Sequence, residues 1–164
     1  MNMTGLLKIS KNSRFLQTSD GAPFFFLADT AWELFHRLTL DEIDFYLDAR
    51  MEQGFNVIQA VLISELDGVR TPNAYGLLPL IDMNPEKPNH DYFDFVEKVL
   101  KMTESKGMFL ALVPGWGDKV DQVFGIGPEI FNAANGYSYG KWLGRRFCRG
   151  MRTYLRNSPC LANV

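Results

Sequence analysis

Three short apolar segments alternate with amphipathic helical segments along residues 1–147. The apolar segments are residues 24–28, 55–63 and 108–113. Because strands that alternate with helices form parallel sheets, this order predicts an α/β fold, either doubly wound or closed as a barrel. A chain of 164 residues with 46% apolar residues is long enough to bury the core of one such domain.

Local signals mark where the helices begin and end. Thr39 and Glu42 match a capping box, in which each side chain accepts a hydrogen bond from the other residue's backbone amide. Gly54 is expected to end this helix, since glycine tolerates the left-handed conformation of a helix C-terminus. Two further helices are expected, from Asn89 or His90 to Gly107 and from Ser138 to Phe147.

The N-terminal residues predict a short β-hairpin. Arg14–Gln17 and Phe24–Ala28 flank a segment that contains Asp20-Gly21, a common hairpin turn. The segment Phe24–Ala28 is continuously apolar, which is typical of a strand that is covered on both faces. We therefore expect this second strand of the hairpin to enter the core.

Carboxylate and tryptophan side chains follow each expected strand. Parallel α/β folds bind ligands at the carboxyl ends of their strands, so these side chains are candidate binding residues. A carboxylate there can accept hydrogen bonds from sugar hydroxyls or act as a general acid or base, and an indole face can stack on a sugar ring. Turn capping, solvated loop charge and core packing are the alternatives. The candidates are Asp29, Trp32, Glu65, Trp116 and Asp118.

Several other chemistries find no support in the sequence. The two histidines, His36 and His90, show no metal-ligand spacing, and no metal or cofactor is expected. Glycine-rich phosphate loops and the G-x-S-x-G elbow are absent. A formal charge of −2 argues against general nucleic-acid binding. Without an apolar run of membrane-spanning length or a signal peptide at Met1–Ser10, the chain as written is expected to be cytoplasmic, although a parent enzyme could be exported.

Four stretches resemble one known family. They are FLADTAWELFHRL (26–38), GFNVIQA (54–60), LVPGWGDK (112–119) and YGKWLGRRF (139–147). The family is the apiosidase-like (β/α)₈ glycoside hydrolases, glycoside hydrolase family 140. The resemblance implies that residues 1–147 are the first three βα units of a TIM barrel, preceded by the hairpin. It also implies a carbohydrate substrate, namely apiose-type side chains of pectin in plant cell walls.

The resemblance stops after Phe147. The family's catalytic carboxylates are an Asp in a Gly-Gly-Asp after the fourth strand and a Glu after a later strand, and neither position exists here. Residues 145–164 carry five arginines and no acid, whereas residues 1–144 carry 12 basic and 19 acidic side chains. We interpret residues 148–164 as a divergent basic tail, and we hypothesise that a frameshift or a truncated gene produced it.

The sequence therefore favours an N-terminal fragment of a glycoside hydrolase that contributes sugar-binding residues but no catalytic residue. Such a fragment is expected to be inactive alone, because a complete (β/α)₈ barrel takes about 250 residues. Two alternatives remain open: a non-catalytic carbohydrate-binding remnant, and a small α/β protein-interaction domain whose arginine-rich tail contacts an acidic partner.

Overall fold

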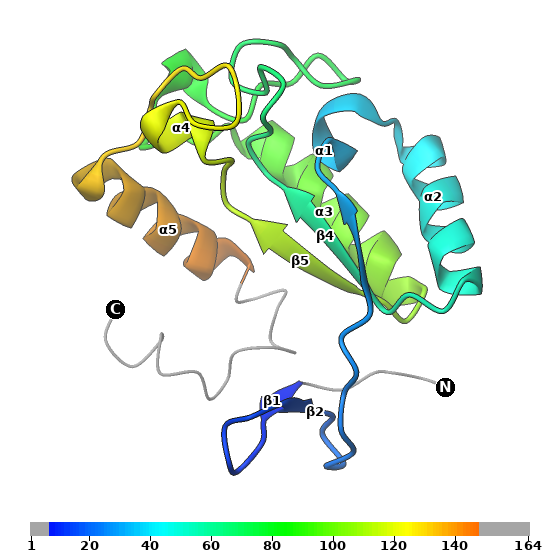
Figure 1. Cartoon of the computed structure of the whole chain (residues 1–164). Coiled ribbons are helices and arrows are strands. Elements are labelled where there is room, and N and C mark those ends of the chain that lie inside the picture. The colour runs from blue at the N-terminus through cyan, green and yellow to red at the C-terminus, as the bar shows by residue number, and fades with distance from the viewer. Residues whose placement is uncertain (1–6, 148–164) are drawn as a thin grey trace.

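The computed structural model of the chain describes residues 7–147, in which a three-stranded parallel sheet is packed against a layer of helices (Figure 1). The predicted tail 148–164 lies outside the described residues. The strand order β3-β4-β5 follows the order of the sequence. This arrangement confirms the α/β class and the parallel sheet that the alternating pattern predicts. The strands are β3 (Ala28–Ala31), β4 (Val57–Val61) and β5 (Phe109–Val113).

The two long helices after β3 and β4 begin as predicted. Thr39 caps α2 with a complete capping box, and the Asn89 side chain accepts a hydrogen bond from the Asp91 amide at the start of α3. Gly54 follows α2 with φ of +87°, in the left-handed region that favours glycine. The helices are α1 (Leu34–Arg37), α2 (Leu40–Glu52), α3 (His90–Ser105), α4 (Asp118–Asp121) and α5 (Ala133–Phe147), with a 3₁₀ turn, η1, at Ile81–Met83.

The predicted start of the last helix at Ser138 is wrong. Helix α5 begins at Ala133, because the Asn132 side chain accepts hydrogen bonds from the backbone amides of Ala134 and Asn135. An asparagine at this point satisfies the first amides of a helix as well as a serine does.

The two faces of the sheet have different environments. Asp29, Ile58 and Leu110 are paired across the three strands, and Ile58 and Leu110 belong to the main hydrophobic core with the helices. Since side chains alternate along a strand, the next row projects from the opposite face. In that row Thr30 is exposed and Gln59 is half-buried. The helix-covered face therefore supplies most of the packing.

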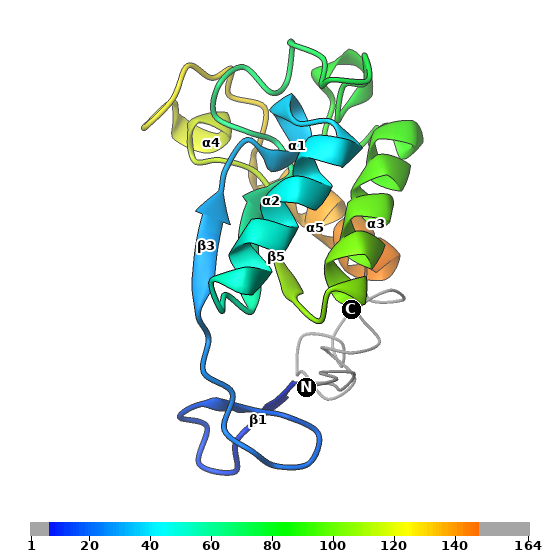
Figure 2. The ribbon, with the colours of Figure 1, turned by 90° about the vertical axis from the view of Figure 1, so that its right-hand side faces the viewer.

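The predicted hairpin forms only at its closed end: Gln17 and Pro23 form an isolated antiparallel bridge, and the Phe24 amide donates a 2.8 Å hydrogen bond to the Leu16 carbonyl. A second antiparallel pairing joins β1 (Lys8–Ile9) to β2 (Leu16–Gln17). The Phe25 side chain is 77% exposed, so the apolar run Phe24–Ala28 is not covered on both faces. Phe24 alone is buried, in a second small cluster with Leu7, Val57 and Phe109. The hairpin lies beyond the amino ends of the parallel strands (Figure 2).

Candidate functional site

The carboxyl ends of the three parallel strands lie at one edge of the sheet, where they bring two tryptophans together. The ring centroids of Trp32, after β3, and Trp116, after β5, are 5.0 Å apart, and the ring planes are tilted by 50°. Both side chains are half-buried. The Trp116 indole N–H donates a 2.7 Å hydrogen bond to the Phe124 carbonyl, which orients the ring. Two expected binding residues from different βα units are therefore in contact.

Asp118 is fully buried beneath the loop that follows β5. Its Oδ2 accepts hydrogen bonds from Lys119 Nζ at 2.8 Å and from the Gly127 amide at 2.9 Å. Lys119 is also fully buried, and it donates a second hydrogen bond to the Gly127 carbonyl at 2.9 Å. This ion pair closes the loop from α4 to residue 127. Within the structure described here, Asp118 thus supports the loop that holds Trp116.

Asp29 lies within β3, one residue past its start, and not after the strand as predicted. Its carboxylate accepts hydrogen bonds from Tyr46 at 2.8 Å and from Arg50, both on α2. Burial acts to raise the pKa of the Asp29 carboxyl, but the Tyr46 and Arg50 hydrogen bonds outweigh it and hold the pKa below its ordinary value. Burial and the nearby Asp29 charge raise the pKa of Tyr46 to about 12. Asp29 therefore joins the sheet to α2.

Glu65 is half-buried at the start of the long segment between β4 and α3, residues 64–88. Among the described residues, no hydrogen bond or ion pair engages its carboxylate. By contrast, Asp67 forms an ion pair with Arg70 at 2.7 Å and accepts a hydrogen bond from Thr71 at 3.1 Å. Of the acids near the start of this segment, Glu65 is the one that is free to contact a ligand.

A buried glutamate–histidine pair at the end of β3 was not predicted from the sequence. Glu33 Oε2 lies 2.6 Å from His36 Nδ1, and His36 Nε2 lies 3.1 Å from the Thr71 carbonyl oxygen. Only 8% of the His36 side chain and 18% of the Glu33 side chain are exposed. The i, i+3 spacing of an acid and a histidine was the available signal in the sequence, but the contact with Thr71 joins residues 35 positions apart.

Among the buried polar atoms without a hydrogen-bond partner in the described part of the chain, one follows each of the three strands. These are Glu33 Oε1 after β3, Ser64 Oγ after β4 and Asp118 Oδ1 after β5, whereas Asn73 Nδ2 and Arg146 Nε lie elsewhere. Buried polar groups in proteins are normally hydrogen-bonded to protein or water. Water or a ligand bound at this edge of the sheet would satisfy these three atoms.

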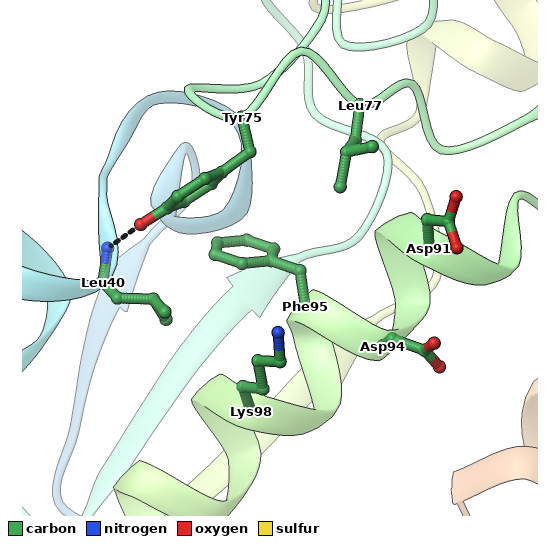
Figure 3. Close-up of a pocket in the computed structure, with 7 residues that line it drawn as sticks. All are labelled: Leu40, Tyr75, Leu77, Asp91, Asp94, Phe95 and Lys98. Atoms are coloured by element: carbon green, nitrogen blue, oxygen red, sulfur yellow. Dashed lines mark hydrogen bonds between the residues drawn. The ribbon is translucent and has the colours of Figure 1, made fainter.

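A separate cavity of about 270 Å³ opens between the start of α2 and the side of α3 (Figure 3). The Tyr75 ring packs against Phe95 with centroids 5.2 Å apart, and its hydroxyl accepts a 2.8 Å hydrogen bond from the Leu40 amide. Neither tryptophan of the pair lines this cavity. The lining residues are Leu40, Tyr75, Leu77, Asp91, Asp94, Phe95 and Lys98.

Residues 10–153 match the family model described as "Apiosidase-like, catalytic domain". The chain belongs to this family. No curated protein sequence matches it. None of the helices between residues 7 and 147 has the length and apolar character that a membrane span needs. Over the same range, His, Cys, Asp and Glu side chains do not gather in groups of three or more that could hold a metal ion.

Solved structures extend the comparison of this apiosidase-like chain to whole enzymes. A glycoside hydrolase family 5 protein from Bacteroides vulgatus is 29% identical with a TM-score of 0.76, and a second protein, titled "Glycoside hydrolase", is 30% identical with a TM-score of 0.75. A third, described as a putative glycoside hydrolase from Bacteroides vulgatus, shares the fold at 17% identity and a TM-score of 0.67. Each match covers 92% of this chain.

The apiosidase-like chain spans about a third of the length of these structures, 31% of the first and 33% of the second. Its parallel sheet and helices thus match part of a TIM-barrel-like glycoside hydrolase fold. The tryptophan pair therefore lies in the third of the glycoside hydrolase fold that this chain matches.

Proposed function

We propose that the chain forms one side of the sugar-binding pocket of a glycoside hydrolase that acts on apiose-bearing side chains of plant cell-wall pectin. The contact between Trp32 and Trp116 carries this proposal. The carboxylates that would cleave the glycosidic bond are expected outside the described residues. Hydrolysis by paired carboxylates needs no cofactor.

The tryptophan pair supplies the apolar part of such a pocket. A sugar ring presents C–H groups on its faces and hydroxyls at its edge, and the tilted indole rings offer a surface for the C–H groups. In this proposal Glu65, which has no partner among the described residues, accepts a hydrogen bond from a sugar hydroxyl. Asp118 and Asp29 act in this proposal as supports, of the Trp116 loop and of α2 respectively.

Titration of the chain with an apiose-bearing pectic oligosaccharide tests the proposal. Tryptophan fluorescence reports directly on the site in the Trp142→Phe variant, because Trp32 and Trp116 are then the two tryptophans that remain. We expect saturable quenching in this variant and a loss of affinity of about tenfold when Trp116 is replaced by alanine, the effect of losing about 1.4 kcal/mol of stacking.

The matched control is Trp142→Phe itself, assayed calorimetrically beside the unmodified chain. Trp142 packs against the hydrophobic core and should leave the affinity unchanged. Equal affinities for the unmodified chain, Trp32→Ala and Trp116→Ala would overturn the proposal. Release of sugar from the oligosaccharide by the chain alone would contradict the expectation that the catalytic carboxylates lie elsewhere.

A further inference from the structure

The buried pair of Glu33 and His36 joins the end of β3 to the segment that follows β4. Glu33 is the residue before α1, and His36 lies within α1, which packs against β4. The His36 ring spans the gap to the Thr71 carbonyl. Thr71 belongs to a compact turn in which its amide donates to the Asp67 carbonyl and its hydroxyl donates to the Asp67 carboxylate. A hydrogen bond from His36 to Thr71 therefore fixes the position of the whole turn, residues 67–71.

The acceptors around His36 fix where its protons lie. The Thr71 carbonyl can only accept a hydrogen bond, so Nε2 must carry a hydrogen. On the other side of the ring, one proton lies between Nδ1 and Glu33 Oε2, carried either by the imidazolium or by the carboxylic acid. Both arrangements leave the pair without net charge, which is the condition under which a buried acid and base are stable together.

We propose that Glu33 and His36 are positioning residues that clamp the turn 67–71 against the end of β3, the strand that Trp32 follows, and thereby fix one side of the proposed sugar-binding pocket. The clamp stands on the geometry alone, whereas its consequence for sugar binding rests on the proposed function. Arg37 lies 3.6 Å from Glu33 through its Nε atom, but its side chain is 60% exposed, and it is not part of the clamp.

Nitrogen NMR of the His36 ring in the unmodified chain tests the proton assignment without any substitution. We expect Nε2 to carry a hydrogen and to show a coupling or a through-space contact to the Thr71 segment. A ring protonated on Nδ1 alone would overturn the proposal, because an unprotonated Nε2 cannot bond to a carbonyl oxygen.

Four variants separate clamping from general destabilisation. In Glu33→Gln the amide can donate to Nδ1 while Nε2–H still reaches Thr71, so the clamp is expected to persist. In Glu33→Ala and His36→Phe we expect amide hydrogen exchange in residues 67–71 to accelerate at least about tenfold, while α3 exchanges as before. Arg37→Ala is the surface control and should change amide exchange neither in residues 67–71 nor in α3. Uniform acceleration across α3 as well, or no acceleration in the turn, would overturn the clamp.

The exciton-coupled circular dichroism of Trp32 and Trp116 provides a readout that mere loss of stability would not reproduce. We expect this signal to decrease in folded His36→Phe and to be retained in Glu33→Gln. Oligosaccharide binding keeps the two proposals distinct. If the unmodified chain binds no sugar but shows the NMR and exchange results above, the proposed function fails and the clamp stands. If it binds sugar and His36→Phe binds equally well with an unchanged exciton signal, the positioning role fails.

Discussion

The Nζ atom of Lys119 lies 2.8 Å from Oδ2 of Asp118, and neither side chain is exposed to solvent. Adjacent residues of opposite charge usually project into water, but here both are enclosed by the loop that returns at Gly127. The pair therefore converts a polar loop into a rigid support for Trp116, the tryptophan that follows β5.

Replacing Lys119 by methionine should lower the free energy of unfolding by about 3–5 kcal/mol, because a buried carboxylate then lacks its counter-charge. Urea unfolding followed by circular dichroism measures the difference. The double variant Asp118→Asn with Lys119→Met should lose less than the single variant. Lys98→Met at an exposed position is the control, with an expected change within about 0.5 kcal/mol. A near-neutral Lys119→Met would contradict the prediction.

The contact of Asp29 with Tyr46 and Arg50 should make stability depend on pH in the acid range. The folded-state pKa of Asp29 is lowered from 3.8, so its contribution is present above that value and is lost as pH falls through the folded pKa. Urea midpoints measured between about pH 5 and pH 2 should fall more steeply for the unmodified chain than for Asp29→Asn. Parallel curves for the two proteins would show that the carboxylate makes no such contribution.

Phe24 should anchor the hairpin to the sheet, and Phe25 should not. The Phe24 ring is buried and packs edge-on against Phe109 with centroids 5.1 Å apart, whereas Phe25 is 77% exposed. Phe24→Ala is expected to cost about 3 kcal/mol and to release the amides of β1 and β2 to hydrogen exchange. Phe25→Ala, the neighbouring control, should change the unfolding free energy by about 0.5 kcal/mol or less. Equal effects would refute this assignment.

The capping box of α2 predicts how substitutions of Thr39 change the free energy of unfolding. Thr39→Ala should lower the free energy of unfolding by about 1 kcal/mol, because the Glu42 amide loses its acceptor. Thr39→Ser preserves the hydroxyl and should stay within a few tenths of the unmodified value. Thermal unfolding of the three proteins in one buffer provides the comparison, and a serine variant as unstable as the alanine variant would argue against the cap.

The sequence predicts best those features that a few neighbouring residues determine. The capping box that starts α2 is formed by Thr39 and Glu42, and the start was predicted correctly. The expectation that Phe24–Ala28 is covered on both faces was wrong, because apolar character does not reveal which side chains find a partner. Of the first two residues of this run, Phe24 packs on Phe109, whereas Phe25 remains exposed. That outcome depends on residues far along the chain.

In the candidate site, too, some features follow from the local sequence and others depend on distant residues. Trp32 and Trp116 were placed correctly at the ends of strands, and the parallel topology then brings their rings into contact. Their role in binding stays a prediction. Asp29 was expected after the first strand because that strand was predicted to end at Ala28. In the structure β3 begins at Ala28, so Asp29 lies within it and its side chain belongs to one face of the sheet. The clamp of His36 on Thr71 depends on how a long loop folds back, and no local pattern specifies that.

The strand order β3-β4-β5 also bears on how such a sheet is assembled. Each parallel pairing joins strands that are neighbours in sequence, so every βα unit emerging from the ribosome finds its partner already present. Across residues 7–147, β5 keeps one edge unpaired and thus offers a template for a further strand. A barrel built in this way can grow one unit at a time, with the tryptophan pair in place as soon as the third unit docks.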